Sequence, residues 1–426
     1  MLTTRPRGTN DLLPGELVKW HYVENVLHQV AALYGYQEIR TPIFEHTELF
    51  QRGVGESTDI VEKEMYTFID RGQRSLTLRP EATASTVRAF LEHKLYAGSL
   101  PVKFYYIGPM FRYDRPQAGR YRQFHQFGVE AFGAQDPSLD AEVIAMAMDI
   151  YQRLGLKNLV VELNSVGCPK CRQAHRQVLQ EYLKGKLAEL CPTCQGRFEK
   201  NPLRILDCKS DHCREVVAEA PTIDQMLCAD CRSHFQLVQE YLQELQVPHN
   251  LNPRLVRGLD YYTKTAFEIV AQGIGAQSSI GGGGRYDHLI EECGGAPLPG
   301  IGYAMGIERI ILTLEEQGID FPIETNLQIF IAALGEQAQK KGVKLSQDLR
   351  KAGLVVERDY FGKSLKAQLK MANRMQAQAA VILGEEELAN EQAVVRKMEE
   401  GLQEVVPLGE LVSYLVKEIK GGKIDE

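Results

Sequence analysis

The segment Arg257-Gly258-Leu259-Asp260-Tyr261-Tyr262 places an arginine, an aspartate and two adjacent tyrosines within six residues. It lies in the run 252–271, whose β-branched and aromatic residues predict a strand. Buried tyrosine hydroxyls require hydrogen-bond partners, and arginine binds carboxylates and phosphates through paired N–H groups. The segment therefore predicts a polar binding site that is carried on a strand.

Two glycine-containing segments follow it. Gly281–Gly284 precede Arg285-Tyr286-Asp287, and glycine allows close approach of the backbone to a ligand, although such a run alone is most often a flexible turn. The stretch Gly302–Arg309 predicts a strand of small residues that runs into a helix beginning at Glu308-Arg309. An arginine there can reach back over a sheet to a phosphate. A surface helix arginine is the alternative.

Upstream, two strands are predicted on either side of an arginine-rich loop. Between Lys103 and His125 the sequence has five basic residues and one acidic residue. Along the second strand, period-two geometry puts Phe124, Gln126, Gly128 and Glu130 on one face. That face is polar where a sheet core should be apolar. It is either a binding surface or the solvent-facing side of a one-sided sheet.

Glu81 and Thr83 follow the strand predicted near residue 78. A carboxylate and a hydroxyl at a strand end can lie at the edge of a cleft, where the carboxylate could pair with a substrate ammonium group. Taken alone, this segment favours a simpler interpretation, a helix N-terminus with Thr83 as the cap and Glu81 near the helix dipole.

Size and composition limit the class of protein. The chain has 426 residues, of which 44% are hydrophobic and 25% charged, and a net charge of -7. This is an ordinary globular composition, long enough for two or three domains. No secretory signal is recognised at the start, and no apolar run reaches the roughly 20 residues of a membrane span. We therefore expect a cytoplasmic protein with no membrane partner.

The pattern of elements changes twice along the chain. Residues 167–248 are predicted to be a helical, cysteine-rich insertion between strands of one sheet. From residue 327, strands alternate with helices, which predicts a small α/β domain with a mostly parallel sheet. We expect a catalytic domain over 1–325 that contains the insertion, and a second domain over 326–426. In the second domain, residues 340–374 have ten basic and three acidic side chains, which predicts a contact with nucleic acid.

Eight of the nine cysteines lie in the insertion. Three Cys-x2-Cys pairs and one Cys-x4-Cys pair favour two tetrahedral zinc sites, because each pair offers thiolates close together in the chain. Free reduced thiols are the alternative, and His212 is a spare ligand. The pairing stays open at this point. The candidate ligands are Cys168, Cys171, Cys191, Cys194, Cys208, Cys213, Cys228 and Cys231.

These segments, in this order, resemble the class II aminoacyl-tRNA synthetases. Pro42 resembles their first, dimer-forming motif, Phe111 to Glu130 the second, and Gly302 to Arg309 the third. The segments 257–262 and 282–287 resemble the signatures of the histidyl-tRNA synthetase family. The resemblance implies an α+β catalytic domain with an antiparallel sheet, a helical insertion that reaches the tRNA acceptor stem, and an α/β anticodon-binding domain. It also implies a homodimer.

The activity implied is that of a ligase. L-Histidine reacts with ATP, with Mg²⁺ on the phosphates, to give histidyl-adenylate, and the histidine then passes to the 3′ end of tRNA(His). The resemblance implies that Glu81, Thr83 and Gln126 hold the histidine ammonium. It implies that Glu130 and Tyr262 read the imidazole, with Tyr261 lining the pocket. Because imidazole has one donor and one acceptor, a polar site could reject analogues that lack them by about 10⁴–10⁵.

The resemblance also implies that Arg112 and Arg309 hold ATP phosphates, while Arg257 contacts the substrate carboxylate and the α-phosphate. Arg112 and Arg257 would thus be the catalytic residues, stabilising negative charge as two anions meet. The chain departs from the family at Ala82, where glycine is usual, and at Asp114, where glutamate is usual. The alternative function is a non-charging regulatory paralogue of ATP phosphoribosyltransferase, which would lack the C-terminal domain and the ATP-handling arginines.

Overall fold

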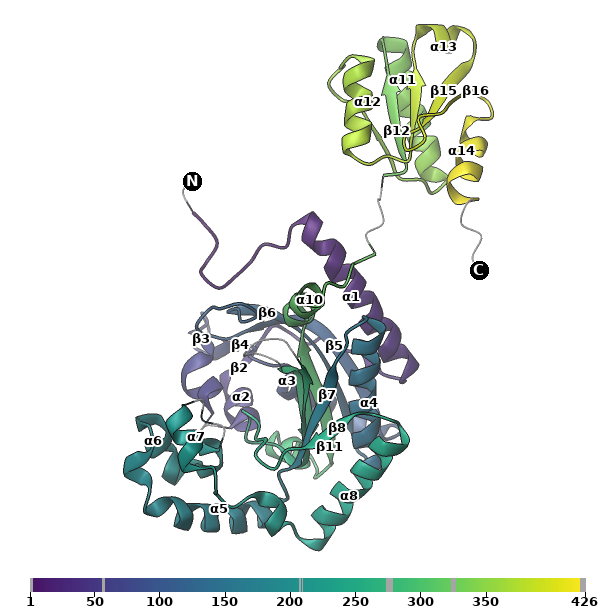
Figure 1. Cartoon of the computed structure of the whole chain (residues 1–426). Helices are drawn as coiled ribbons and strands as arrows, with labels where there is room; N and C mark the ends of the chain where they lie inside the picture. The colour runs from purple at the N-terminus through teal and green to yellow at the C-terminus, as the bar shows by residue number, and fades with distance from the viewer. Residues whose placement is uncertain are drawn as a thin grey trace. The chain divides into compact units, whose positions relative to one another are not determined.

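The computed structural model describes residues 3–55, 58–206, 208, 210–272, 279–322 and 327–421. The chain divides into two compact units, Met1–Phe321 and Pro322–Glu426 (Figure 1). The predicted domain boundary between residues 325 and 326 lies outside the described residues. Among the described residues, no helix is both long and apolar enough to cross a membrane.

An eight-stranded sheet forms the centre of the first unit. Its strands, in spatial order, are β1 (Gln37–Glu38), β5 (Val102–Phe111), β6 (Gln123–Phe132), β11 (Gly300–Gly306), β10 (Ser279–Arg285), β9 (Thr263–Ala271), β7 (Leu159–Ser165) and β8 (His249–Leu251). Neighbouring described strands are antiparallel except for the two edge pairs, β1–β5 and β7–β8. The predicted antiparallel sheet is confirmed, with a parallel pair at each edge.

One face of this sheet is covered by helices α1 (Pro14–Leu33), α4 (Pro137–Arg153), α8 (Ala229–Glu244) and α10 (Ile307–Glu316). Helix α1 buries Trp20, Val23 and Leu27, which are three and four residues apart and so lie on one stripe. From β6, Phe127 and Val129 enter the same core. Because side chains alternate along a strand, the even-numbered residues from Gln126 to Glu130 face the other side, where the candidate site lies.

The other face carries smaller elements. Aromatic and aliphatic side chains of α3 and α9 pack there against β5 and β6. A three-stranded antiparallel sheet in the order β2-β4-β3 leads into α3. The elements are β2 (Phe44–His46), α2 (Thr47–Val54), the π-helical turn η1 (Ile60–Glu64), β3 (Tyr66–Ile69), β4 (Ser75–Leu78), α3 (Thr83–Glu92), the 3₁₀ turn η2 (Leu95–Ala97) and α9 (Leu289–Glu292).

The segment Arg257–Tyr262 is not on a strand, and this part of the prediction is wrong. Strand β8 ends at Leu251 and β9 begins at Thr263. Between them Asn252 makes a turn, accepting from Leu255 N at 2.9 Å through its carbonyl and from Arg254 N at 3.2 Å through its side chain. Pro253 has no N–H to donate to a sheet. The signature is therefore an ordered loop that enters the central sheet only at its end.

A helical segment separates β7 from β8 (Figure 1). Its first and last helices are long, and shorter helices and 3₁₀ turns lie between them. Helix α8 returns the chain to the central sheet, where it packs on α4. The remaining elements are α5 (Pro169–Lys184), η3 (Leu187–Glu189), α6 (Pro192–Lys200), η4 (Pro202–Ile205), α7 (Asp211–Val216) and η5 (Ile223–Met226).

The second unit is an α/β sandwich around a five-stranded sheet in the order β13-β12-β14-β15-β16. The first three strands are parallel, as the alternating pattern predicts, but β15 and β16 add two antiparallel strands that were not predicted. The elements are β12 (Ile329–Ala333), α11 (Glu336–Lys351), β13 (Val356–Arg358), α12 (Leu365–Arg374), β14 (Ala379–Leu383), α13 (Glu385–Ala389), β15 (Gln392–Lys397), β16 (Gln403–Pro407) and α14 (Leu411–Lys420).

Candidate functional site

Two adjoining cavities lie on the polar face of the central sheet. The smaller has a volume of about 190 Å³ and the larger about 380 Å³. The smaller is below the range that accommodates drug-sized ligands, roughly 300–1,000 Å³, and the larger is within it. The two share wall residues, among them Arg112, Gln126 and Arg257. The arrangement suits a small polar molecule beside a larger anionic one.

Five of the six residues predicted to bind histidine line the smaller cavity. They come from the start of α3, from β6 and from the 257–262 loop, which are far apart in the sequence. They are Glu81, Thr83, Gln126, Tyr261 and Tyr262. The sixth, Glu130, lies behind the wall, where it is buried and hydrogen-bonded to wall residues.

Glu81 caps helix α3. Its carboxylate accepts hydrogen bonds from the backbone N–H groups of Thr83 at 2.7 Å and Ala84 at 3.0 Å. The simpler interpretation of this segment is thus partly right: a helix begins here, but its N-cap residue is Ala82, and the Glu81 carboxylate accepts from its first N–H groups. Burial raises the pKa of Glu81, while the N–H groups of Ala84 and Thr83 favour its charged form. Ala82 has a φ of -117°, so the alanine causes no backbone strain.

Glu130 is surrounded by hydroxyl groups. Its carboxylate accepts from Thr83 Oγ1 at 2.7 Å, from Tyr106 Oη at 3.2 Å and from Tyr286 Oη. Burial raises the pKa of Glu130 to about 8, although hydrogen bonds from Tyr286 and Thr83 oppose the shift. Glycine at 302 makes this position accessible, because a Cβ there would overlap the carboxylate of Glu130. A titratable carboxyl thus lies directly beneath the smaller cavity.

Two buried polar atoms on the shared wall have no hydrogen-bond partner among the residues that the structure describes. They are Gln126 Oε1 and Arg257 Nε. A buried polar atom left unpaired costs about 1–3 kcal/mol, so natural proteins rarely keep one without a role. Both atoms belong to residues that line both cavities. The arrangement fits a ligand that completes these hydrogen bonds.

The three predicted ATP-binding arginines all line the larger cavity. Arg112 Nε donates to the carbonyl oxygen of Pro80 at 2.8 Å, and its guanidinium lies 5.3 Å from the centre of the Phe124 ring. Arg309 Nη1 donates to Ser279 O at 2.7 Å. Arg257 pairs with Glu268 and lies over Tyr262. Each side chain is therefore held by protein groups while it lines a common cavity.

Sequence reasoning missed several residues at these cavities. Tyr106 and Tyr286 line the smaller one, and Arg120 and Arg204 line the larger one. Tyr286 had a signal, because it lies inside the glycine-rich motif. Asp114, the second departure from the family, also lines the larger cavity, where Arg120 Nη1 lies 3.4 Å from its carboxylate.

A buried ionic network supports the site from behind. Arg285 and Asp140 are both fully buried and form an ion pair. Asp140 Oδ1 also lies 3.1 Å from His234 Nε2 on α8, and Arg285 Nη1 donates to Ala134 O at 3.0 Å. The network ties the end of β10 to α4 and α8. The network fixes Arg285, and Arg285 directly precedes Tyr286, whose hydroxyl donates to Glu130.

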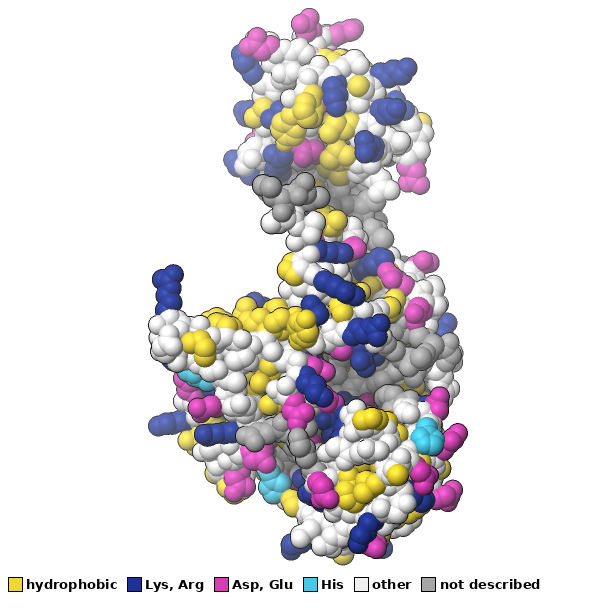
Figure 2. Space-filling model, turned by 90° about the vertical axis from the view of Figure 1, so that its left-hand side faces the viewer, with side chains coloured by type: hydrophobic (Ala, Val, Ile, Leu, Met, Phe, Trp, Pro, Cys, Tyr) yellow, Lys and Arg dark blue, Asp and Glu magenta, His cyan; other side chains and the backbone are white. Residues whose placement is uncertain are grey.

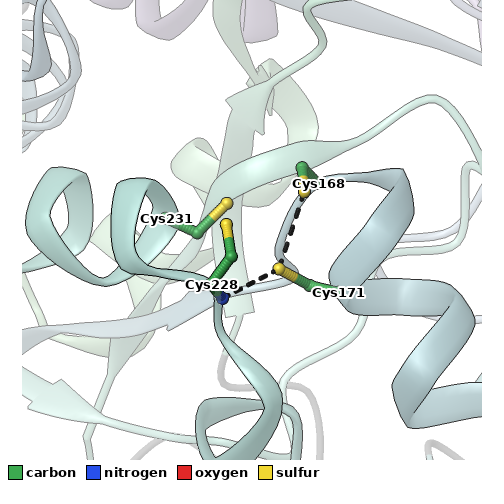
Figure 3. Close-up of side chains that lie close together, drawn as sticks. All are labelled: Cys168, Cys171, Cys228 and Cys231. Atoms are coloured by element: carbon green, nitrogen blue, oxygen red, sulfur yellow. Dashed lines mark hydrogen bonds between the residues drawn. The ribbon is translucent and has the colours of Figure 1, made fainter.

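The eight cysteines of the helical segment form two groups of four. We name Cys168, Cys171, Cys228 and Cys231 the root cluster, because it joins the start of α5, just after β7, to the start of α8, the helix that packs on α4 (Figure 3). We name Cys191, Cys194, Cys208 and Cys213 the lobe cluster. Among the described residues none of the eight forms a disulfide, and His212 belongs to neither group.

The second unit carries a basic surface. Figure 2 shows Lys and Arg side chains around a hydrophobic patch on the visible face of this unit. In the loop between β13 and α12, Tyr360 is 57% exposed and Phe361 72% exposed. The ring centres lie 4.3 Å from the guanidinium of Arg358 and 4.7 Å from the ammonium of Lys363, respectively. Exposed rings next to cations are suited to stack on nucleic-acid bases.

Comparison with known proteins gives consistent matches over both units. The histidyl-tRNA synthetase family model matches residues 8–310, and the anticodon binding domain model matches residues 328–418. The histidine–tRNA ligase of Desulforamulus reducens is 64% identical over 415 residues, which cover 97% of this chain and 99% of the relative. That of Moorella thermoacetica is 61% identical over 422 residues, 99% of this chain and 100% of the relative.

Solved structures agree in fold. The apo histidyl-tRNA synthetase of S. aureus has a TM-score of 0.84 and 42% identity, covering 97% of this chain and 100% of that one. A Bacillus halodurans C structure described as an ATP phosphoribosyltransferase regulatory subunit/histidyl-tRNA synthetase has a TM-score of 0.65 at 21% identity, covering 90% of this chain and 99% of that one. At 21% identity, the similarity to the Bacillus halodurans C structure shows the fold alone.

Proposed function

The chain belongs to the histidyl-tRNA synthetase family, and from this premise we propose how its two cavities carry out the family's reaction. The activity is that of a histidine–tRNA ligase. L-Histidine and ATP form histidyl-adenylate with release of diphosphate, and the histidine is then transferred to the 3′ end of tRNA(His). We propose that the smaller cavity binds histidine and the larger one binds ATP.

One observation carries this assignment. Arg112, Gln126 and Arg257 line both cavities, and two of their buried atoms have no hydrogen-bond partner in the described part of the chain. In adenylate formation the histidine carboxylate attacks the α-phosphate, so two anions must meet. Fixed guanidinium groups at the meeting point stabilise the charge that develops there. Arg257 and Arg112 are therefore our proposed catalytic residues.

Histidine recognition is assigned to the polar groups of the smaller cavity. Glu81, Thr83 and Gln126 are proposed to hold the ammonium group, because Glu81 supplies negative charge and Gln126 Oε1 is an unpaired acceptor. Tyr262 and Glu130 are proposed to read the imidazole, with Tyr261 lining the pocket. Glu130 acts from beneath, through the hydroxyls of Thr83 and Tyr286 that it accepts from.

The ATP subsite is assigned to Arg112, Arg257 and Arg309. Mg²⁺ fits this cavity, because Glu64 lines it and carboxylate oxygens are the ligands that Mg²⁺ prefers. Asp59 also lines the cavity, but its Oδ2 is paired with Arg197 and Arg204. When bound with ATP, the ion would offset part of the phosphate charge. The protein's own contribution is to orient the nucleotide, with Arg309 held by Ser279 and Arg112 held by Pro80.

The alternative function, a non-charging regulatory paralogue, is not favoured. The chain keeps an anticodon-binding domain and all three arginines of the larger cavity. Relatives that match nearly the whole chain at 61–64% identity are histidine–tRNA ligases.

We propose that the catalytic domain spans residues 1–325, with the insertion at 167–248, and that residues 326–426 form the anticodon-binding domain. We also propose a homodimer. Ile43, Phe44, Phe68 and Ile69, on and next to the sheet β2-β4-β3, are large apolar side chains that are exposed in the single chain, and such patches mark protein interfaces. A cytoplasmic location is proposed with the function, since translation consumes charged tRNA there.

The tRNA is proposed to contact the basic residues 340–374 of the second unit and the insertion of the first. The exposed rings of Tyr360 and Phe361 support base stacking in the anticodon loop. In the insertion, we propose zinc as the bound metal, because the described cysteines provide two groups of four thiols and tetrahedral thiolate sites are typical of zinc.

The test of this function is ATP–diphosphate exchange with each amino acid in turn. We expect exchange with L-histidine and none with amino acids that lack an imidazole, because the polar groups of the smaller cavity would then be left unpaired. A folded, ATP-binding sample that shows no exchange with histidine would falsify the proposal.

A further inference from the structure

The sulfur spacing in both cysteine clusters matches a metal site. Four sulfurs around a tetrahedral zinc, at Zn–S distances of about 2.3 Å, lie about 3.8 Å apart. Cys168 Sγ and Cys171 Sγ are 3.6 Å apart, and Cys191 Sγ and Cys208 Sγ are 3.9 Å apart. Within each cluster all four sulfurs lie within 4.8 Å of one another. A disulfide would need an S–S distance of about 2.05 Å, so these sulfurs are not bonded to one another. Their separations instead fit four ligands around a shared ion.

The surroundings of the sulfurs give a second, independent observation. The backbone N–H of Cys228 donates to Cys171 Sγ at 3.2 Å, and that of Cys191 donates to Cys213 Sγ at 3.2 Å. The two clusters are thus built alike. Within each cluster, the backbone N–H of one cysteine donates to the sulfur of a cysteine from a different chain segment. Such bonds stabilise the thiolate form, which is the form that binds metals.

Cys168, Cys191 and Cys228 are also the N-cap residues of helices α5, α6 and α8. The positive end of each helix dipole therefore lies at a cysteine pair. In Figure 3 the four side chains of the root cluster point toward a common centre from the starts of α5 and α8. This arrangement offsets the charge that four thiolates would bring together.

We propose that the chain binds two zinc ions, one in the root cluster and one in the lobe cluster, and that these ions hold the insertion against the mouths of both cavities. The metal assignment stands on the cysteine geometry, whereas its consequence for activity rests on the proposed function.

The root cluster is connected to the histidine side. Arg172, the residue after Cys171, donates through Nη1 to the carbonyl oxygen of Asp260 at 3.1 Å. Asp260 directly precedes Tyr261 and Tyr262, which line the smaller cavity. A metal that fixes the start of α5 therefore fixes the support of the tyrosine loop.

The lobe cluster is connected to the ATP side. Helix α6 begins at the Cys191 pair and carries Arg197, and Arg204 follows it in η4. Both arginines place an Nη2 atom 2.9 Å from Asp59 Oδ2, and Asp59 lines the larger cavity. Cys194 and Cys213 belong to the small apolar core of this lobe, so a metal bound there would tie the start of α6 to that core.

The experiment measures metal content in the full-length protein, purified without added metal. Three forms are compared with the wild type: the double variants Cys168→Ser/Cys228→Ser and Cys191→Ser/Cys208→Ser, and the control Cys293→Ser. The four replaced ligands are partly exposed, and serine caps helices well, so the helix starts should persist. Cys293 lies outside both clusters.

We expect about two zinc ions per chain in the wild type and in the control, and about one in each double variant. One zinc or none in the wild type, or a double variant that still holds two, overturns the proposal. If a variant fails to fold, cobalt(II) exchanged into the wild type serves instead. It should give the visible absorption of tetrahedral thiolate coordination, and its absence also overturns the proposal.

The consequence for activity is measured as KM for histidine and for ATP in steady-state ATP–diphosphate exchange. Relative to Cys293→Ser, we expect the root variant to raise KM for histidine about tenfold and the lobe variant to raise KM for ATP by a similar factor, equivalent to about 1.4 kcal/mol each. Unchanged KM values in variants that have lost zinc would refute the coupling. Failure of the wild type to exchange would instead count against the proposed function and leave the metal result intact.

Discussion

Glu130 is a buried carboxyl beneath the smaller cavity. It is buried and in contact with three hydroxyl groups, and burial raises its pKa to about 8. Near neutral pH the carboxyl is thus largely protonated while no ligand is bound. A protonated carboxyl can donate as well as accept, so the proton of Glu130 affects how the hydroxyls of Thr83 and Tyr286 are oriented.

This shift has a consequence for stability. Because the folded-state pKa of about 8 exceeds the ordinary glutamate value of 4.5, the folded protein binds an extra proton between these values. The stabilisation is fully present below the lower pKa and is lost as pH rises through the upper one. We expect the unfolding midpoint of the wild type to fall relative to Glu130→Gln as pH rises from about 5 to about 9.

Thermal unfolding of both proteins across this range checks the expectation. Glu92→Gln, which changes an exposed glutamate on α3, is the control and should track the wild type. Parallel profiles for Glu130→Gln and the wild type would contradict the assigned protonation.

At the scale of elements, the junction of β10 with α4 and α8 holds the site in shape. Arg285 is buried without access to solvent and depends on Asp140 for its charge balance. Burial opposes ionisation of Asp140, but the charge of Arg285 holds its pKa below the usual value. The pair therefore stays ionised inside the protein. Loss of Asp140 would leave Arg285 with the longer contact of its Nη1 to the Asp287 carboxylate, at 3.3 Å, as its remaining ion pair among the described residues.

We expect Asp140→Asn to lower the free energy of unfolding by about 3 kcal/mol, the lower end of the usual cost of breaking a buried ion pair, because Asp287 still faces Arg285. Asp149→Asn is a matched control, since Asp149 pairs with Arg153 on the same helix at the surface. It should cost less than about 1 kcal/mol. Equal midpoints for the two variants in urea denaturation would show that the buried pair is not essential.

The elements also show what the sequence could and could not reveal. The polar face of β6 was predictable, because its even-numbered polar residues Gln126 and Glu130 alternate with the core residues Phe127 and Val129 in a local pattern. The loop at 257–262 was predicted as a strand, because its composition is strand-like and only Pro253 and Gly258 argue otherwise.

Contacts between distant segments could not be predicted in the same way. The grouping of the cysteines depends on where α5 and α8 begin in space, which the spacing of cysteines does not determine. Likewise, the contact of Tyr286 with Glu130 joins residues 156 positions apart. The resemblance to a family could name the residues of this site but not their partners, such as the Glu81 carboxylate that caps α3.

At the scale of the whole molecule, a chain of net charge -7 keeps a local excess of seven positive charges in residues 340–374. That stretch lies entirely in the second unit, apart in sequence from the cavities of the first. Activation of histidine and recognition of the anticodon are therefore expected to be separable by mutation.

We expect Phe361→Ala to raise KM for tRNA about tenfold in aminoacylation and to leave histidine-dependent exchange unchanged, since stacking on an aromatic ring contributes about 1–3 kcal/mol per base. Leu402→Ala, another exposed apolar residue of the second unit, is the control. An unchanged KM for tRNA in the Phe361 variant would argue against stacking.

The most direct test of the joined cavities is histidine-dependent ATP–diphosphate exchange by Arg257→Ala, with Arg254→Ala as the control from the same loop. Arg257 lines both cavities, whereas Arg254 is exposed and lines neither. We expect the Arg257 variant to remain folded and to lose at least about 100-fold in exchange rate, the usual effect of removing a group that stabilises developing charge. The Arg254 variant should match the wild type. Exchange by Arg257→Ala within about threefold of the wild type, less than about 1 kcal/mol, would contradict the account.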